Sequence, residues 1–277
     1  MNTSHGTKIR MAELTADEAR PILARNPVVL LPLGSLEDQG PHAPMGDFLC
    51  AARVAELIAE RANDEGVPTL VAPVLPFGGA DFFGTMPGGI ALSQVTLVSV
   101  LRDMLSCLLR HGLTRIVVVN GHGGNVHAIH QATQEVYRQQ DVLVPSLYLW
   151  QIGYRLLPTL VGAETASKVA GHGGDPLSSV AMHLFPDLVR TDLVPGPTTR
   201  CKVMGLDVTG FATIGFDGID IQVPLELDEI APNGVFGADP RLCSAETGER
   251  LTDEIVRIGS RFIAHHAAHS LMHRKGN

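Results

Sequence analysis

The chain has 277 residues, of which 45% are hydrophobic, 5% aromatic and 18% charged, and this composition excludes a disordered or fibrous protein. Its formal net charge is -8 and its basic residues form no run, which argues against nucleic acid or an anionic membrane as a partner. The N-terminus has no apolar signal segment, and no stretch approaches the roughly 18 apolar residues of a membrane span, so we expect a cytoplasmic protein.

The predicted elements alternate between helix and strand from the N-terminus onward. A capping-box pattern opens a short helix over residues 15–25, and the apolar run at 28–33 predicts a strand buried on both faces. Apolar positions then recur at helical spacing over residues 47–63, and the run at 70–74 predicts a second strand.

The same alternation continues through the rest of the chain. We expect helices over residues 93–111, 125–139 and 244–269, and strands over 115–119 and 142–150. Residues 193–237 are rich in Gly, Pro, Asp and Thr and indicate only short β-like pieces. Strands separated by helices predict an α/β fold with a mainly parallel sheet and helices on both faces, and without a linker or repeat we expect a single domain over residues 1–277.

The first candidate functional segment, residues 34–47, directly follows the first predicted strand. Ligands bind beyond the carboxyl ends of strands in parallel sheets, and this loop gathers Glu37, Asp38, His42 and Asp47 between Gly and Pro residues. Carboxylates and imidazoles bind Zn, Mn or Fe. The alternative is an acidic surface loop in which Asp47 serves only as the cap of the next helix.

Two further segments each place a histidine among glycines. In residues 119–125, His122 follows the most hydrophobic strand, and glycines leave an imidazole uncovered, as a metal ligand or catalytic base requires. The spacing lacks the features of a dinucleotide or phosphate-binding loop. In residues 171–179, His172 is followed by Asp175, a carboxylate three residues later. The simpler interpretation of this segment is a turn in which Asp175 caps the next helix.

Other candidates have weaker support. His127, His130 and His183 lie within predicted helices and are interpreted as helix-face residues. The sequence has no G-x-S-x-G elbow and no cysteine signature, so covalent catalysis has little support. Carboxylates and histidines without a nucleophile favour water activated by a metal ion.

Together, these three segments resemble the creatininase (creatinine amidohydrolase) family. The family pattern is G-S-x-E-Q-H-G-P-H-x-P, then N-G-H-G-G-N, then H-A-G-E-x-E-T-S. Residues 73–78, 86–90 and 233–240 are also similar to family segments. The resemblance implies a single-domain α/β sandwich, a metal-dependent hydrolase with one or two divalent ions, and a homo-oligomer such as a hexamer.

The resemblance also implies roles for individual residues. Glu37, Asp47 and His122 match metal ligands of the family, and Asp175 stands where many members have the glutamate of H-A-G-E, so it is a candidate ligand and catalytic group. His172 matches the family histidine that moves protons during ring opening.

Three positions depart from the family pattern. Gln39 replaces a ligand histidine, Asp38 replaces the usual glutamine, and Leu177 replaces the second glutamate of E-x-E-T-S. Glutamine is a poor zinc ligand, so we expect one metal site to be weakened, emptied, or rebuilt with Gln39, Asp38 or water.

The resemblance implies that metal-activated water opens a small cyclic substrate, either a cyclic amide or a related carbonyl compound. Zinc is the first expectation for the metal, with manganese or iron as alternatives. The loop variants are also similar to a family branch that hydrolyses the inositol ketone 3-dehydro-scyllo-inosose. A non-catalytic metabolite-binding protein and a subunit whose main task is assembly remain as alternatives from other classes.

Overall fold

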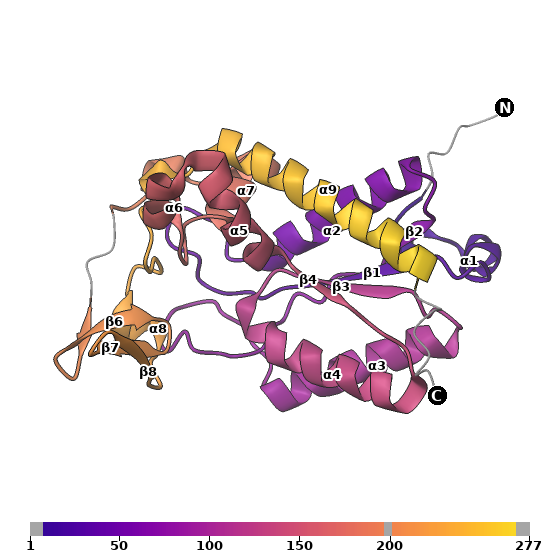
Figure 1. Ribbon diagram of the computed structural model, residues 1–277, viewed down its shortest axis with the longest axis horizontal. Helices are drawn as coiled ribbons and strands as arrows, with labels where there is room; N and C mark the ends of the chain where they lie inside the picture. The colour runs from indigo at the N-terminus through magenta and orange to yellow at the C-terminus, as the bar shows by residue number, and fades with distance from the viewer. Residues whose placement is uncertain (1–7, 197–200, 270–277) are drawn as a thin grey trace.

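A four-stranded parallel sheet lies at the centre of the computed structural model, which describes residues 8–196 and 201–269 (Figure 1). The strand order is β2 (Thr69–Val71), β1 (Val28–Leu33), β3 (Ile116–Asn120), β4 (Ser146–Tyr148), and each neighbouring pair is parallel. Every residue of β1 and β3 is buried, as continuous apolar runs in a doubly covered sheet require.

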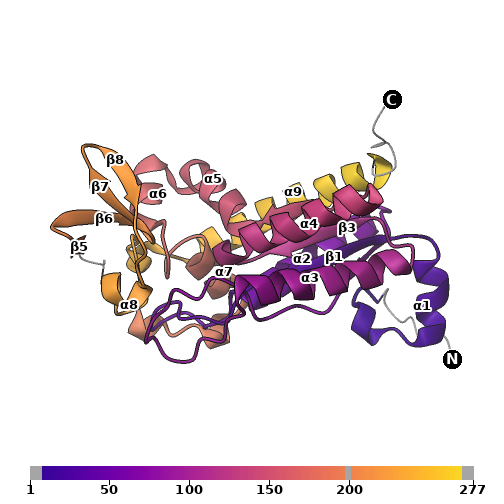
Figure 2. The same ribbon diagram turned by 90° about the horizontal axis from the view of Figure 1, so that it is seen from below.

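Helices cover both faces of this sheet (Figures 1 and 2). Alternate side chains of β3 enter opposite cores, since Val117 and Val119 pack on one face, and Ile116 and Val118 on the other. The first layer consists of α2 (Asp47–Asp64), α5 (Leu149–Val161), α6 (Ala163–Val169), α7 (Leu177–Leu184) and α9 (Ala245–His269). The second consists of α3 (Gln94–Arg110) and α4 (Val126–Gln140). The predicted α/β sandwich is therefore confirmed.

One predicted strand is too long at both ends. We expected a strand over residues 142–150, but β4 begins at Ser146 and ends at Tyr148, and Leu149 and Trp150 already belong to α5. The apolar run crosses this boundary without a break, and hydrophobicity alone does not separate a short buried strand from a buried helix. α5 was not predicted for the same reason, and α6 was not predicted either.

A second, antiparallel sheet projects from one end of the molecule (Figures 1 and 2). We call residues 202–222, which form this sheet, the arm. It contains β5 (Lys202–Val203), β6 (Leu206–Gly210), β7 (Thr213–Phe216) and β8 (Ile219–Gln222). A small core with α8 (Leu227–Ile230) anchors it, and the predicted short β pieces are confirmed.

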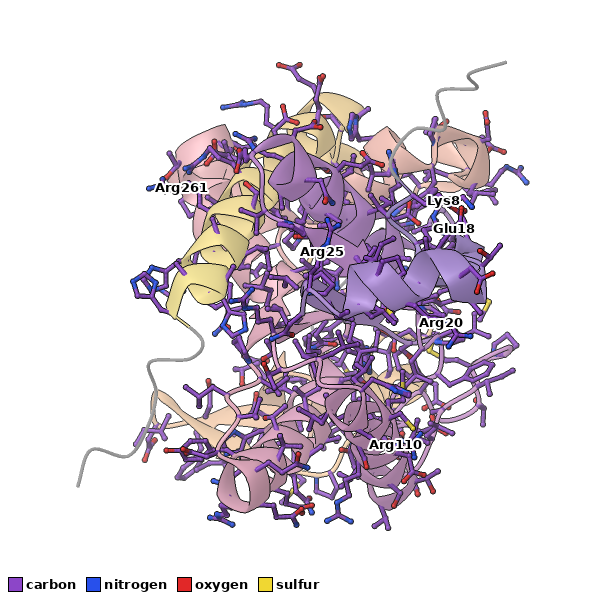
Figure 3. All side chains as sticks on the ribbon, turned by 90° about the vertical axis from the view of Figure 1, so that its right-hand side faces the viewer. Lys8, Glu18, Arg20, Arg25, Arg110 and Arg261 are labelled. Carbon is purple, nitrogen blue, oxygen red and sulfur yellow. The ribbon has the colours of Figure 1, made fainter. Side chains whose placement is uncertain are left out.

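The opposite end of the molecule is polar. There α1 (Ala16–Leu23) begins with the predicted capping box, and Lys8 Nζ lies 2.8 Å from Glu18 Oε1. Figure 3 views the molecule from that side and labels both residues. Within residues 8–196 and 201–269, no helix has both the length and the apolar character needed to cross a membrane.

Candidate metal centre

The first two predicted segments meet because they leave neighbouring strands at the same edge of the sheet. β1 and β3 pair in parallel, and their last residues, Leu33 and Asn120, lie opposite each other. The loop that carries Glu37 therefore starts beside the loop that carries His122. This is the edge at which parallel sheets bind ligands.

Asp47 joins them because the first loop folds back on itself. The Glu37 amide donates a hydrogen bond to Met45 O (2.8 Å), and this pairing returns the chain to the start of α2 beside Glu37. Asp47 occupies the first turn of α2, and its Oδ1 accepts a hydrogen bond from the amide of Ser35. The other carboxylate oxygen, Oδ2, faces His122.

Three ligand atoms converge at this point. His122 Nδ1 lies 3.0 Å from Glu37 Oε2 and 3.2 Å from Asp47 Oδ2, and all three side chains are buried. One ligand atom from each residue lies within 4.8 Å of the other two. Two carboxylates and one imidazole form a donor set that suits zinc and related divalent cations.

Hydrogen bonding leaves His122 Nδ1 able to bind a cation. His122 Nε2 lies 3.1 Å from Gly79 O, and because a carbonyl only accepts, Nε2 carries the proton in the neutral ring and Nδ1 the lone pair. Gly124 permits this contact, since a Cβ there would lie 2.4 Å from Gly79 O and 2.5 Å from His122 Nε2. Any larger residue at position 124, two residues after His122, would therefore block this hydrogen bond.

The electrostatics of the cluster also call for a cation. Burial and the nearby Glu37 charge raise the pKa of Asp47 to about 7. Burial disfavours protonation of His122, but the Glu37 and Asp47 carboxylates outweigh it and raise its pKa well above the usual value. Glu37 Oε2 is buried and has no hydrogen-bond partner. A divalent cation would satisfy this oxygen and balance both carboxylates, so the residues fit a metal site.

Two of the three residues that depart from the family pattern, Gln39 and Asp38, lie outside the ligand group. Gln39 is buried beside the cluster, and its Nε2 donates a 2.7 Å hydrogen bond to Glu37 Oε1. Asp38 Oδ1 instead accepts a 2.7 Å hydrogen bond from the Gly40 amide. Asp38 is therefore held in its own turn, and within the described part of the chain it is not a member of the ligand group.

Asp175 is not brought into the ligand group that the described residues form. Its Oδ1 accepts a 3.0 Å hydrogen bond from the amide of Ser179 in the first turn of α7, whereas its Oδ2 is buried and has no hydrogen-bond partner. Burial raises the pKa of Asp175. This geometry agrees with the simpler interpretation of a helix cap, because the carboxylate satisfies a free N–H of α7. Its roles as ligand and catalytic group stay predictions.

His172 lies beside the cluster in an apolar environment. Its Nε2 lies 2.6 Å from Asp38 O, and its ring packs 5.3 Å from that of Phe211 and 5.6 Å from that of Phe83, measured between centroids. Burial lowers the pKa of His172. Because Asp38 O only accepts, the neutral ring carries its proton on Nε2 and its lone pair on Nδ1.

A cavity of about 690 Å³ contains the cluster and His172. Aromatic side chains that the sequence analysis missed line it, and among the described lining residues there is no lysine or arginine. Tyr148 is the last residue of β4 and Trp150 comes two residues later, so the rule that directed attention to His122 could have found them. Phe82 and Phe211 lie in loops and gave no comparable signal. His127, from α4, also lines the cavity.

Comparisons with known proteins agree on one family. The creatininase family model, described as creatinine amidohydrolase, matches residues 12–263. A mycofactocin precursor peptide peptidase of Mycolicibacterium smegmatis is 30% identical over 252 residues, covering 88% of this chain and 87% of the relative. A creatinine amidohydrolase of Pseudomonas putida is 33% identical over 196 residues, covering 64% and 71% respectively.

The inositol-ketone branch has a more distant match. A 3-dehydro-scyllo-inosose hydrolase of Thermotoga maritima is 25% identical over 119 residues, covering 42% of this chain and 37% of the relative. Among solved structures, a mutant creatininase of Zn-Zn type gives a TM-score of 0.74 at 26% identity, covering 94% of this chain and 98% of that one. A manganese creatininase gives 0.72 at 26% identity, covering 93% and 98%.

Proposed function

The chain belongs to the creatininase family of hydrolases, and from this premise we propose that it hydrolyses an amide bond in a small, uncharged substrate, with cyclic amides as the first class. The convergence of His122 Nδ1 with two buried carboxylates in an aromatic cavity carries the proposal. The names of two relatives, an amidohydrolase and a peptidase, both denote cleavage of an amide C–N bond.

We propose Glu37, Asp47 and His122 as the residues that hold the divalent cation. Zinc is the first candidate and manganese the second, because related creatininases are described as Zn-Zn and manganese forms. Iron rests on the family resemblance alone. A divalent cation bound there would polarise a carbonyl group and lower the pKa of coordinated water from about 15.7 towards about 7.

His172 has the position and protonation state for proton transfer. Its Nε2–H is occupied by Asp38 O, which leaves Nδ1 to accept a proton and later return it to the departing nitrogen. The lowered pKa of His172 keeps the ring neutral near pH 7, as an acceptor requires. Phe211 and Phe83 pack against this ring and shield part of it from water.

The cavity lining favours an uncharged substrate. The described lining residues contain the carboxylates Glu37 and Asp47 but no lysine or arginine that could pair with an anionic group. The aromatic walls would stack on a planar amide. The inositol ketone stays as an alternative substrate, supported by the distant relative and by the Glu37-Asp38-Gln39 variant of the loop.

Metal analysis followed by an assay tests the proposal. Purified protein should contain a divalent cation and hydrolyse at least one compound from a panel of creatinine, other cyclic amides and short peptides, with the inositol ketone as the competing class. Glu37→Gln and His122→Ala should lose both metal and activity, whereas His127→Ala, on the cavity wall, should keep the metal. Full activity after complete removal of metal by a chelator would refute the mechanism, and tight binding without turnover would favour a metabolite-binding protein.

We also propose that the chain forms homo-oligomers, with a hexamer as the first candidate. Support comes from the family resemblance and from apolar side chains of the arm, of which Phe216, Ile219 and Ile221 are exposed.

A further inference from the structure

We propose that this chain binds one divalent cation, not two, and that Gln39 is a positioning residue for that cation and not a ligand. The inference rests on the metal dependence proposed above and deepens it, since it assigns the stoichiometry and a role for a position at which the family ligand is missing. It follows from how Gln39 contacts Glu37 and from the charges that the site contains.

The contact between Gln39 and Glu37 fixes the orientation of the amide. An ionised carboxylate only accepts hydrogen bonds, so the atom of Gln39 that lies 2.7 Å from Glu37 Oε1 is the nitrogen, Nε2. An amide nitrogen has no lone pair to offer a metal. The side chain is buried, so the bond is shielded from competing water. Glu37 Oε1 is thereby occupied, and Oε2 alone is left to face His122 and Asp47.

This bond determines the direction in which Glu37 presents its free oxygen. Metal-binding carboxylates are commonly held by hydrogen bonds to a neighbouring group, which orients the ligand oxygen before the metal arrives. Gln39 has this geometry with respect to Glu37, as Gly79 O has with respect to His122 Nε2. The Ser35 amide holds Asp47 Oδ1 in the same way, so all three ligands are oriented by a direct hydrogen bond on the side away from the cluster.

The charges of the cluster balance one divalent cation. Glu37 and Asp47 supply two negative charges, and the imidazole of His122 binds a metal in its neutral form. A second divalent cation would leave two positive charges without partners in a buried site, which is strongly unfavourable. In the part of the chain that the structure describes, no fourth acidic or imidazole group joins the cluster. Asp38 and Asp175 are committed to backbone amides elsewhere.

Stoichiometry is the direct test. Metal-free protein titrated with Co²⁺, followed by visible absorption and by elemental analysis after desalting, should saturate at one equivalent per chain. Two tightly bound equivalents would overturn this inference and leave the proposed hydrolase function intact. Failure to bind any cation would instead refute the metal-dependent function on which the inference depends.

The variant Gln39→Met separates a positioning residue from a ligand. Methionine has a similar length but donates no hydrogen bond, so the variant should still bind one equivalent, with an altered Co²⁺ spectrum and an affinity weaker by about tenfold to a hundredfold. The matched control is Gln131→Met, since Gln131 lines the same cavity but bonds to Glu135. Complete loss of binding, as expected for Glu37→Gln, would show that Gln39 is a ligand. An unchanged affinity and spectrum would refute the positioning role.

Discussion

Two histidines in similar glycine-rich loops have opposite protonation behaviour because their neighbours differ. His122 Nδ1 faces two carboxylates, and these raise its pKa in the absence of a metal. His172 is surrounded by aromatic rings and a backbone carbonyl, and burial lowers its pKa. Paired titratable groups with opposite shifts commonly divide the work of a site. In the proposed function, the division is between a metal ligand, His122, and a proton carrier, His172.

The pH dependence of activity should report the state of His172. In the proposed mechanism the neutral form of His172 is active, and burial lowers its pKa, so activity should be retained near neutral pH and lost as the pH falls through the lowered pKa. His172→Asn keeps an N–H donor for Asp38 O but no proton acceptor. It should remove this acid limb and lower kcat by about a hundredfold to ten-thousandfold. Rates of both proteins measured from pH 4.5 to 8 check this.

Two controls make that result specific. Metal content should stay constant over the pH range used, because a falling metal content would produce an acid limb of its own. His127→Ala should keep the wild-type profile, since His127 lines the cavity on a different element, α4. An acid limb that persists in His172→Asn would assign the titration to another group.

The sequence could predict the clustering of Glu37, Asp47 and His122 but not the behaviour of their neighbours. The first and third follow adjacent parallel strands, and strand order places such residues together. The position of Asp175 depends on whether its carboxylate caps α7 or turns to the cavity, a choice that the motif leaves open. The contact of His122 with Gly79 O joins residues 43 positions apart in the chain. The local sequence around either residue does not predict this contact.

At the scale of elements, the packing of α7 against α9 supports the loop that carries His172. The two helices approach so closely that a Cβ on Gly248 of α9 would lie 1.9 Å from Ser179 O of α7. α7 begins at Leu177, directly after that loop. The position of α9 therefore determines where the loop lies at the edge of the cavity.

Gly248→Ala should destabilise the protein. The added methyl group would clash with the backbone oxygen of Ser179, which cannot move aside as the end of a flexible side chain can. The helices must therefore separate, and we expect this overpacking to lower the free energy of unfolding by about 1–3 kcal/mol. The free energy of unfolding in urea measures this cost. Glu249→Ala, on the exposed side of the same turn, should change it by less than about 0.5 kcal/mol. Equal stability of the two variants would contradict the close packing.

The elements differ in how well their sequences specify them. The strand predicted at residues 28–33 coincides with β1, because Asn26, Pro27 and Gly34 bound its apolar run. The helix predicted from residue 244 matches α9, whose apolar positions keep a helical period along its length. α5 was missed because the apolar run of β4 continues directly into it, and only tertiary packing ends the strand at Tyr148.

At the scale of the whole molecule, the two ends have different surfaces. The end seen in Figure 3 carries exposed charged side chains, among them Arg20, Arg25, Arg110 and Arg261. At the other end, register places Ile214, Phe216, Ile219 and Ile221 on one face of the arm, since 214 pairs with 221 and 216 with 219. Ile214 is buried against the small core around α8, whereas the outer part of the same face is uncovered. An apolar face that extends beyond its cover is typical of an interface.

The arm should therefore mediate the proposed self-association. The side chains of Phe216 and Ile219 are 53% and 64% exposed. Packing both against a second copy of the chain would remove their apolar surface from water, which favours association. Light scattering on the wild-type protein as it elutes from a size-exclusion column should give a multiple of the chain mass of 29.5 kDa. The double variant Phe216→Lys with Ile219→Lys should give the mass of one chain, because two like charges at these paired positions would be buried in the interface without partners.

The control for the arm lies at the opposite end of the molecule. Arg20→Glu introduces an equally large change of charge on an exposed surface and should leave the assembly unchanged. The arm variant should keep its thermal unfolding transition and its bound metal, which separates loss of assembly from loss of fold. A wild-type chain that elutes as a monomer would contradict the proposed oligomer. An arm variant that keeps the wild-type mass would show that the copies associate through another surface.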